Sequence, residues 1–347
     1  MGKHPNYNPS PLQNLFFRSK ELGVAVQQKR ESSNISPSLR HWFVMEEFQD
    51  WLFTFVGAIT CFICLVNCIW FLKYFFPRIW SPVPQSFFQS MGEWAVITGA
   101  GDGIGKAYSF ELAKRGLNTV LISRTLEKLK KVASEIEKAT GRNVKIIQAD
   151  FTKNDIYDDI EERLQGLEIG ILVNNVGMLH NTYPCCFLDG SKKDEDLINC
   201  NMIAVSKMTQ IIMKQMVSRQ KGLILNIASA VGTFPCPLYT IYSASKAFVY
   251  TFSKALEVEY KTKGIIIQVV TPYGVSTPMS ENPKPNLITK SAKAFVRESL
   301  DYVRLRDETH GCLAHEILAV FLHFVPLWVF HANRVQEIIL RLNPKHR

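Results

Sequence analysis

Short apolar runs alternate with longer amphipathic stretches through the middle of the chain. Six of the apolar runs have the length and β-branched content of strands, and stretches with helical periodicity lie between them. These runs are Trp94–Thr98, Thr119–Ser123, Val144–Ala149, Ile169–Val173, Leu223–Asn226 and Ile265–Thr271. Continuously apolar strands are typical of a parallel sheet that helices cover on both faces. The pattern therefore predicts one doubly wound, Rossmann-like α/β domain.

A longer apolar run precedes this domain. Trp51–Leu72 contains 22 residues without a charge, which is long enough to cross a bilayer as a helix. A signal peptide has a shorter apolar core, and a buried helix is seldom apolar on every side. Acidic residues precede the run, whereas Lys73 and Arg78 follow it. By the positive-inside rule, we expect a single N-terminal anchor with the rest of the chain in the cytosol.

Changes of composition suggest five segments. We expect a polar, disordered extension over 1–44, a membrane anchor over 45–80 and a proline-containing linker over 81–91. The α/β domain should occupy 92–310, and an apolar helical segment with a basic tail should occupy 311–347. Within that last segment, Ile317–Phe330 is too short for a confident second span. A core helix, an oligomer face and an interfacial segment beside a bilayer all remain open for it.

Charge and cysteine content narrow the classes of partner. The net charge is +9, with 47% hydrophobic residues, and no basic run resembles those that follow nucleic-acid phosphates. We therefore expect no nucleic-acid partner. Three of the eight cysteines, Cys61, Cys64 and Cys68, lie in the apolar run without a second pair or a histidine. No metal site is expected, and the thiols should be reduced.

A glycine-rich turn follows the first strand. Gly99, Gly103 and Gly105 have the spacing T-G-x-x-x-G-x-G between a strand and an amphipathic helix. Such a turn presents backbone N–H groups and a helix N-terminus to a pyrophosphate, and glycine allows close approach. The sequence therefore predicts a dinucleotide site here. Its lining should also include Gly101, Asp102 and Ile104.

The end of the second strand indicates which dinucleotide binds. Enzymes that prefer NAD usually place an acid there to hold the ribose 2′-hydroxyl. This chain has Ser123 and Arg124 instead. An arginine can pair with a 2′-phosphate and stack on adenine, so NADPH is the expected cofactor.

Further motifs make the chain resemble the short-chain dehydrogenase/reductase family over about residues 92–303. They are "TGAGDGIG", "NNVG" at Asn174–Gly177, the serine of "NIAS" and "YSASK" at Tyr242–Lys246. Each motif is weak alone, but their order and spacing together are specific. The chain departs from common family residues at Val176, Ala228 and Tyr273, and the last puts the shape of the substrate pocket in doubt.

The resemblance implies roles for individual residues. Tyr242 would be the general acid, with its pKa lowered by Lys246 four residues along the same helix face. Lys246 would also hold the nicotinamide ribose, and Ser229 would position the substrate oxygen. Asn201 would hold a water in a proton relay. The remaining implied contacts are Asp150, Asn175 and Thr277 to the cofactor, and Tyr239 to the substrate, with Phe234 and Tyr273 as further candidate walls.

Sequence segments between and around these motifs, for example "ISRTLEKL" and "GLEIGILVNNVGML", are similar to those of the microsomal 17β-hydroxysteroid dehydrogenases. The similarity implies reduction of a steroid 17-ketone to a 17β-hydroxyl, such as androstenedione to testosterone, at the endoplasmic reticulum membrane. A 3-oxoacyl-CoA reductase of fatty-acid elongation, with the same machinery, is the alternative. An inactive scaffold with the same fold is a third possibility, and a homodimer stays open.

Overall fold

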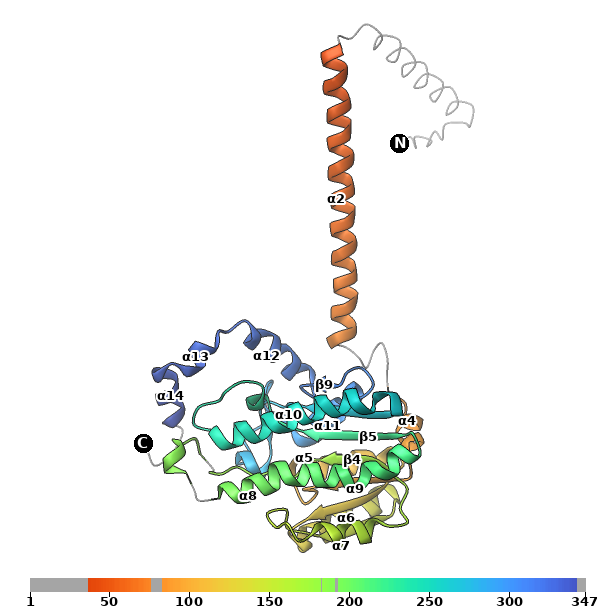
Figure 1. The fold of residues 1–347 in the computed structure, drawn as a ribbon, viewed down its shortest axis with the longest axis vertical. Coiled ribbons are helices and arrows are strands. Elements are labelled where there is room, and N and C mark those ends of the chain that lie inside the picture. The colour runs from red at the N-terminus through yellow and green to blue at the C-terminus, as the bar shows by residue number, and fades with distance from the viewer. Residues whose placement is uncertain (1–36, 76–82, 182, 191–192, 342–347) are drawn as a thin grey trace, which may run out of the picture. The chain divides into compact units, whose positions relative to one another are not determined.

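The computed structural model describes residues 37–75, 83–181, 183–190 and 193–341. The chain divides into two units, residues 1–71 and 72–347. The described part of the first unit belongs to one long helix, and the second unit contains the α/β domain (Figure 1).

Helix α2 extends from Pro37 to Phe75. Within it, Phe48–Lys73 has the length and apolar composition of a membrane span, with a mean hydropathy of 2.3 and no buried residues. The helix begins inside the segment that was expected to be disordered, so that expectation fails for residues 37–44. Proline is well tolerated at the first helical position, where no backbone N–H is needed, and no further proline or glycine interrupts the chain before Gly57.

A seven-stranded parallel sheet forms the centre of the second unit. Its order is β3-β2-β1-β4-β5-β6-β9. The six predicted strands are confirmed to within a residue or two at their ends. The bounds are β1 Trp94–Thr98, β2 Asn118–Ser123, β3 Val144–Gln148, β4 Ile169–Asn174, β5 Gly222–Ile227, β6 Ile265–Val270 and β9 Glu308–Thr309.

Helices cover both faces of this sheet (Figure 1). One hydrophobic core holds α5 Gly103–Lys114, α6 Leu126–Thr140 and α11 Ala292–Ser299 against the strands. The opposite face carries α7 Tyr157–Leu164, α9 Ala204–Ser218 and α10 Thr240–Tyr260. The remaining helices are α4 Gln85–Met91, α8 Asp194–Ile198, α12 Leu313–His323, α13 Leu327–His331 and α14 Asn333–Leu340. The doubly wound prediction is therefore confirmed.

Three features differ from the sequence pattern. The expected linker over 81–91 contains α4, because Phe88 and Met91 are buried in the core and fix that turn of chain as a helix. Two-residue strands β7 Val275–Ser276 and β8 Lys290–Ser291 pair with each other, and β9 extends the main sheet. The apolar stretch 317–330 is divided between α12 and α13, with Pro326 immediately before α13.

The strand order positions the functional site. The chain runs from β1 outward through β2 to β3, and then returns to place β4 on the other side of β1. At such a reversal the connections after the two central strands diverge, and they leave a crevice at the carboxyl edge of the sheet.

Candidate active site

A cavity of about 880 Å³ opens along this edge. Its walls come from the turns after β1, β2, β3, β4 and β5, from α10, and from the loop that follows β6. This volume lies within the range of pockets that enclose a small-molecule ligand.

The glycine turn forms the wall after β1. Gly99 and Gly103 both have positive φ, at 66° and 54°, a conformation that favours glycine. At Gly103 an added Cβ would lie 3.3 Å from Thr277, so the loop after β7 packs directly on the turn. Asn175, at the end of β4, donates from Nδ2 to the carbonyls of Thr98 and Gly99 at 3.0 and 3.3 Å. This bare backbone at the N-terminus of α5 fits a pyrophosphate.

Gly105 and Gly101 support the turn from behind rather than lining the cavity. A Cβ on Gly105 would approach the carbonyl oxygen of Gly99 to 2.2 Å, which no side chain could tolerate. The first turn of α5 can therefore lie against the glycine turn only because residue 105 has no side chain.

Charged side chains of both signs line the β2 end of the cavity. Ser123 and Arg124 line it as predicted, and so does Asp150 at the end of β3, where its carboxylate accepts bonds from the amide and hydroxyl of Thr152. Lys128 also lines the cavity, and its Nζ lies 2.6 Å from Asp102 Oδ2 across the glycine turn. Lys128 was not predicted as a site residue. Its place in the first turn of α6, directly after the strand-end Arg124, was the signal that could have identified it.

Tyr242, Ser229 and Lys246 meet at the other end. Ser229 follows β5, while Tyr242 and Lys246 lie one turn apart on α10, and all three line the cavity. The Ser229 side chain lies close enough to the Tyr242 hydroxyl to lower its pKa. Lys246 is buried, its Nζ donates to the carbonyl of Ile227 at 3.0 Å, and it lies 5.8 Å from the centre of the Tyr242 ring. The spacing that prompted the prediction therefore brings the three side chains together.

The pKa of Tyr242 differs from the expectation. Burial raises it to about 12, and the neighbouring Ser229 side chain only partly opposes this change. The same burial lowers the pKa of Lys246 to about 8. Lys246 was expected to lower the pKa of the tyrosine, but at this separation burial outweighs its charge. Tyr242 is consequently held as a neutral phenol at physiological pH, which is the form that can donate a proton.

Asn201 lies behind Lys246. It is fully buried in a π-helical turn, Asn199–Ile203, and a local π-turn often marks a functional site. Its amide bonds both backbone groups of Met178 and donates to Ser245 Oγ at 2.9 Å. Asn201 Oδ1 and Lys246 Nζ each lie 3.4 Å from the position that a Cβ on Gly177 would occupy. The two polar atoms therefore face the same small space.

Apolar and aromatic side chains line the cavity beyond Tyr242. Tyr239 lies edge-on to Tyr242 with ring centroids 6.5 Å apart, and Phe234 and Tyr273 form further walls, as the sequence suggested. Leu322 reaches this end from α12 and was not predicted. Ile104 and Thr277 line the cavity between the two ends. Hence the predicted residues form one continuous site, with Gly101, Gly105 and Asn201 just behind its surface.

Comparison with known proteins agrees with this geometry. A family model for short chain dehydrogenase matches residues 93–287. The human 17-beta-hydroxysteroid dehydrogenase type 3 is 60% identical over 297 residues, which cover 86% of this chain and 94% of the relative. A very-long-chain 3-oxoacyl-CoA reductase from Anas platyrhynchos is 47% identical over 264 residues, 74% of this chain and 82% of the relative.

A solved structure has the same fold. The short-chain dehydrogenase from Sphingobium yanoikuyae in complex with NADPH is 31% identical, with a TM-score of 0.56, and the match covers 60% of this chain and 83% of that one. The resemblance inferred from the motifs, including the similarity to 17β-hydroxysteroid dehydrogenases, is confirmed. The chain belongs to the short-chain dehydrogenase family of oxidoreductases.

Proposed function

We propose that this enzyme reduces a steroid 17-ketone to a 17β-hydroxyl with NADPH, converting androstenedione to testosterone. The observation that carries the proposal is the adjacency of Tyr242 and Ser229 where they line the apolar end of the cavity. A rigid apolar ketone needs such an apolar slot with one polar grip. Identities of 60% and 59% to type 3 enzymes from human and rat support the same substrate class.

The cavity suits NADPH along its whole length. The glycine turn would take the pyrophosphate, and Arg124 with Lys128 would take the 2′-phosphate. Thr277 and Lys246 lie where they can hold the nicotinamide end. When bound, the cofactor supplies the hydride that the ketone carbon accepts.

The protein's own residues move the proton. Tyr242, neutral because its pKa is about 12, donates its phenolic proton to the ketone oxygen, while Ser229 donates a hydrogen bond to that oxygen. Lys246, with a pKa of about 8, can return a proton to Tyr242 at neutral pH. The space shared by Lys246 and Asn201 would hold a water of the proton relay that the family resemblance implies.

Reduction of a 3-oxoacyl-CoA is the second candidate. Identity to the acyl-CoA reductases, 45–48%, favours it enough to require a test. Coenzyme A carries phosphates, which need cationic partners. Among the described lining residues, the cations are Arg124, Lys128 and Lys246, whereas the apolar end carries Glu281, bonded to the Tyr183 hydroxyl at 2.9 Å. This distribution favours the steroid. An inactive scaffold is disfavoured because every reacting group is in place.

A comparison of the two substrates tests whether the enzyme prefers the steroid or the acyl-CoA. Membranes that contain the full chain receive androstenedione or a 3-oxoacyl-CoA with NADPH, and kcat/KM is measured for each. We expect the steroid to have the higher value. A higher value for the acyl-CoA would overturn the steroid assignment and support the second candidate, and no turnover of either ketone would support a scaffold.

We also propose that Phe48–Lys73 anchors the enzyme in the endoplasmic reticulum membrane with the catalytic unit in the cytosol. Its length, its exposed apolar side chains and the basic residues that follow it support this arrangement. Protease treatment of sealed microsomes tests it, because a cytosolic catalytic unit is digested without detergent. Protection of that unit would contradict the orientation. Formation of a homodimer stays a prediction.

A further inference from the structure

Helix α12 is buried in its first turn and exposes apolar side chains in the turns that follow. Its inner side, at that first turn, carries His315 and Glu316, which are fully buried. Beyond this turn its outer side carries Ile317, Val320 and Phe321, which are exposed. The usual arrangement buries the apolar stripe and exposes the charged one. The outer side of α12 is therefore suited to an apolar partner.

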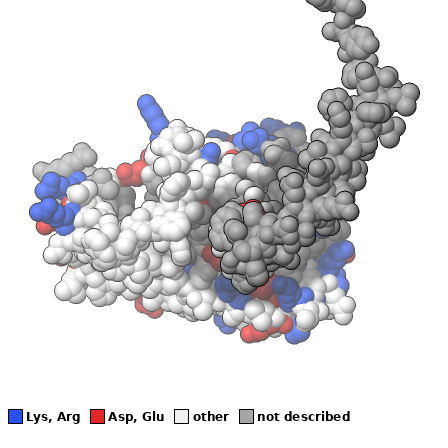
Figure 2. All heavy atoms as spheres, turned by 90° about the horizontal axis from the view of Figure 1, so that it is seen from above, with Lys and Arg blue, Asp and Glu red and all other residues white. Residues whose placement is uncertain are grey.

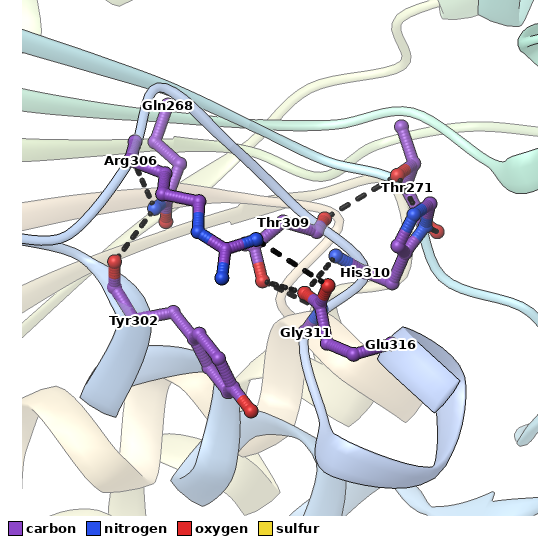
Figure 3. A network of polar contacts seen from close by, with 8 residues as sticks. All are labelled: Gln268, Thr271, Tyr302, Arg306, Thr309, His310, Gly311 and Glu316. Carbon is purple, nitrogen blue, oxygen red and sulfur yellow. Dashed lines mark hydrogen bonds and ion pairs between the residues drawn. The ribbon is translucent and has the colours of Figure 1, made fainter. Parts of the chain in front are cut away.

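The inner side is held by specific bonds (Figure 3). Glu316 accepts hydrogen bonds at 2.7 Å from both the Thr309 hydroxyl and the His310 amide, and Arg306 lies 3.7 Å from its other oxygen. His310 in turn contacts Thr271 at the end of β6. These bonds satisfy the buried carboxylate and fix which side of α12 faces outward.

The apolar side continues over the turn into α13. Phe324 is 78% exposed and Trp328 is 71% exposed, with Leu327 exposed between them. No Lys, Arg, Asp or Glu occurs from Ile317 through Asn333. Figure 2 looks onto this side, where spheres without acidic or basic colour form a broad area. We call the set Ile317, Val320, Phe321, Phe324, Leu327 and Trp328 the outer apolar face.

We propose that the outer apolar face lies in the interface of a lipid bilayer, as a second membrane contact in addition to the N-terminal anchor. Tryptophan is favoured at this depth, and basic residues at the edge suit anionic headgroups. Exposed Arg334 on α14 and Arg341 just after it follow in the sequence. The proposal rests on the proposed membrane attachment, in which 11 residues of sequence, 74–84, lie between the end of the span and the start of α4.

The outer apolar face also borders the substrate end of the cavity. Leu322, on the inner side of the same helix, lines that cavity. Phe330 of α13 packs on the cavity residue Phe234 with ring centroids 5.5 Å apart, and His331 bonds the Pro235 carbonyl at 3.0 Å. A lipophilic ketone dissolved in the bilayer would thus meet the helices that form the cavity wall. The face would deliver substrate from lipid.

The fluorescence of Trp328 tests the contact itself. The full chain and its Trp328→Phe variant are placed in phosphatidylcholine–phosphatidylserine vesicles with or without brominated acyl chains, and their difference spectrum reports Trp328. We expect brominated lipid to quench most of this emission and aqueous iodide to quench little. Quenching by iodide alone would place Trp328 in water. Emission that neither quencher reduces, but that changes with the protein-to-lipid ratio, would indicate that a second copy of the chain covers the outer apolar face. Either result overturns the proposal.

Kinetics in the same vesicles test whether substrate reaches the cavity from the bilayer. Phe324→Asp should raise KM for a membrane-dissolved steroid about three- to tenfold, with kcat and NADPH affinity little changed. Val258, 75% exposed on α10, provides the matched control, and Val258→Asp should leave KM unchanged. Equal KM values for the two variants would contradict delivery from lipid. If Trp328 is quenched by lipid but no steroid is reduced, the contact stands and the proposed substrate fails.

Discussion

Lys128→Ala should weaken the binding of NADPH while leaving the binding of NADH nearly unchanged. Lys128 Nζ lies 2.6 Å from Asp102 Oδ2, and both side chains are about half exposed, so the pair contributes less than ~1 kcal/mol to folding. In the bound enzyme the same lysine would contact the 2′-phosphate and also neutralise Asp102. A hydrogen bond to a charged group contributes about 1.5–3 kcal/mol. We therefore expect NADPH affinity to fall about 10- to 100-fold, with NADH affinity nearly unchanged.

Titrations with 2′,5′-ADP and 5′-AMP, followed by protein fluorescence, measure the two affinities without turnover. Lys131→Ala, an exposed lysine on the same helix that does not line the cavity, is the control and should have no effect. Adding Asp102→Asn to Lys128→Ala should recover part of the loss, because it removes a carboxylate that repels the phosphate. Equal losses for both nucleotides, or none for either, would refute a role in binding the phosphate.

Three further predictions follow. Arg124→Asp should shift the kcat/KM preference from NADPH towards NADH, and an unchanged ratio would show that Arg124 does not contact the 2′-phosphate. Lys246→Met should abolish turnover yet stabilise the fold by about 2 kcal/mol at pH 7, about 3 from removing a buried ammonium less about 1 for its bond to Ile227. Because the pKa of Lys246 is depressed to about 8, its penalty is complete below that pH and fades towards pH 10.5, so the variant should lose its advantage at high pH, where the bond to Ile227 makes the wild type more stable by about 1 kcal/mol. A chain begun at Met45 should keep full activity and membrane association, and loss of either would show that residues 1–44 contribute.

The strands were predictable because their pattern is local. Five or six apolar residues bounded by turns, as at β1 and β5, suffice for a buried parallel strand. Strand β9 has two residues, Glu308 and Thr309, and exists only because β6 offers a free edge. Likewise, the prolines around residues 82–84 suggested a linker, whereas the core that accepts Phe88 makes the next turns a helix. Tertiary contacts decided both elements.

The proximity of Tyr242 and Lys246 was also predictable because their spacing is local in sequence. Tyr242 and Lys246 are one helical turn apart, so their proximity follows from helix geometry. The pKa of Tyr242 could not be predicted in this way, because it depends on burial by neighbours that are distant in sequence. Lys128 was missed since its contact with Asp102 crosses from α6 to the glycine turn. Leu322 reaches the cavity only through the fold of α12.

The most direct test of the account compares wild type with Tyr242→Phe, using the full chain in vesicles with androstenedione and NADPH. The variant keeps the ring and removes only the hydroxyl beside Ser229. We predict testosterone formation by the wild type and a fall of about 10²- to 10⁴-fold in turnover for the variant, with the Kd for NADPH within a few-fold. Retention of more than about a tenth of wild-type turnover would contradict proton donation by Tyr242, since general acids typically contribute far more than tenfold.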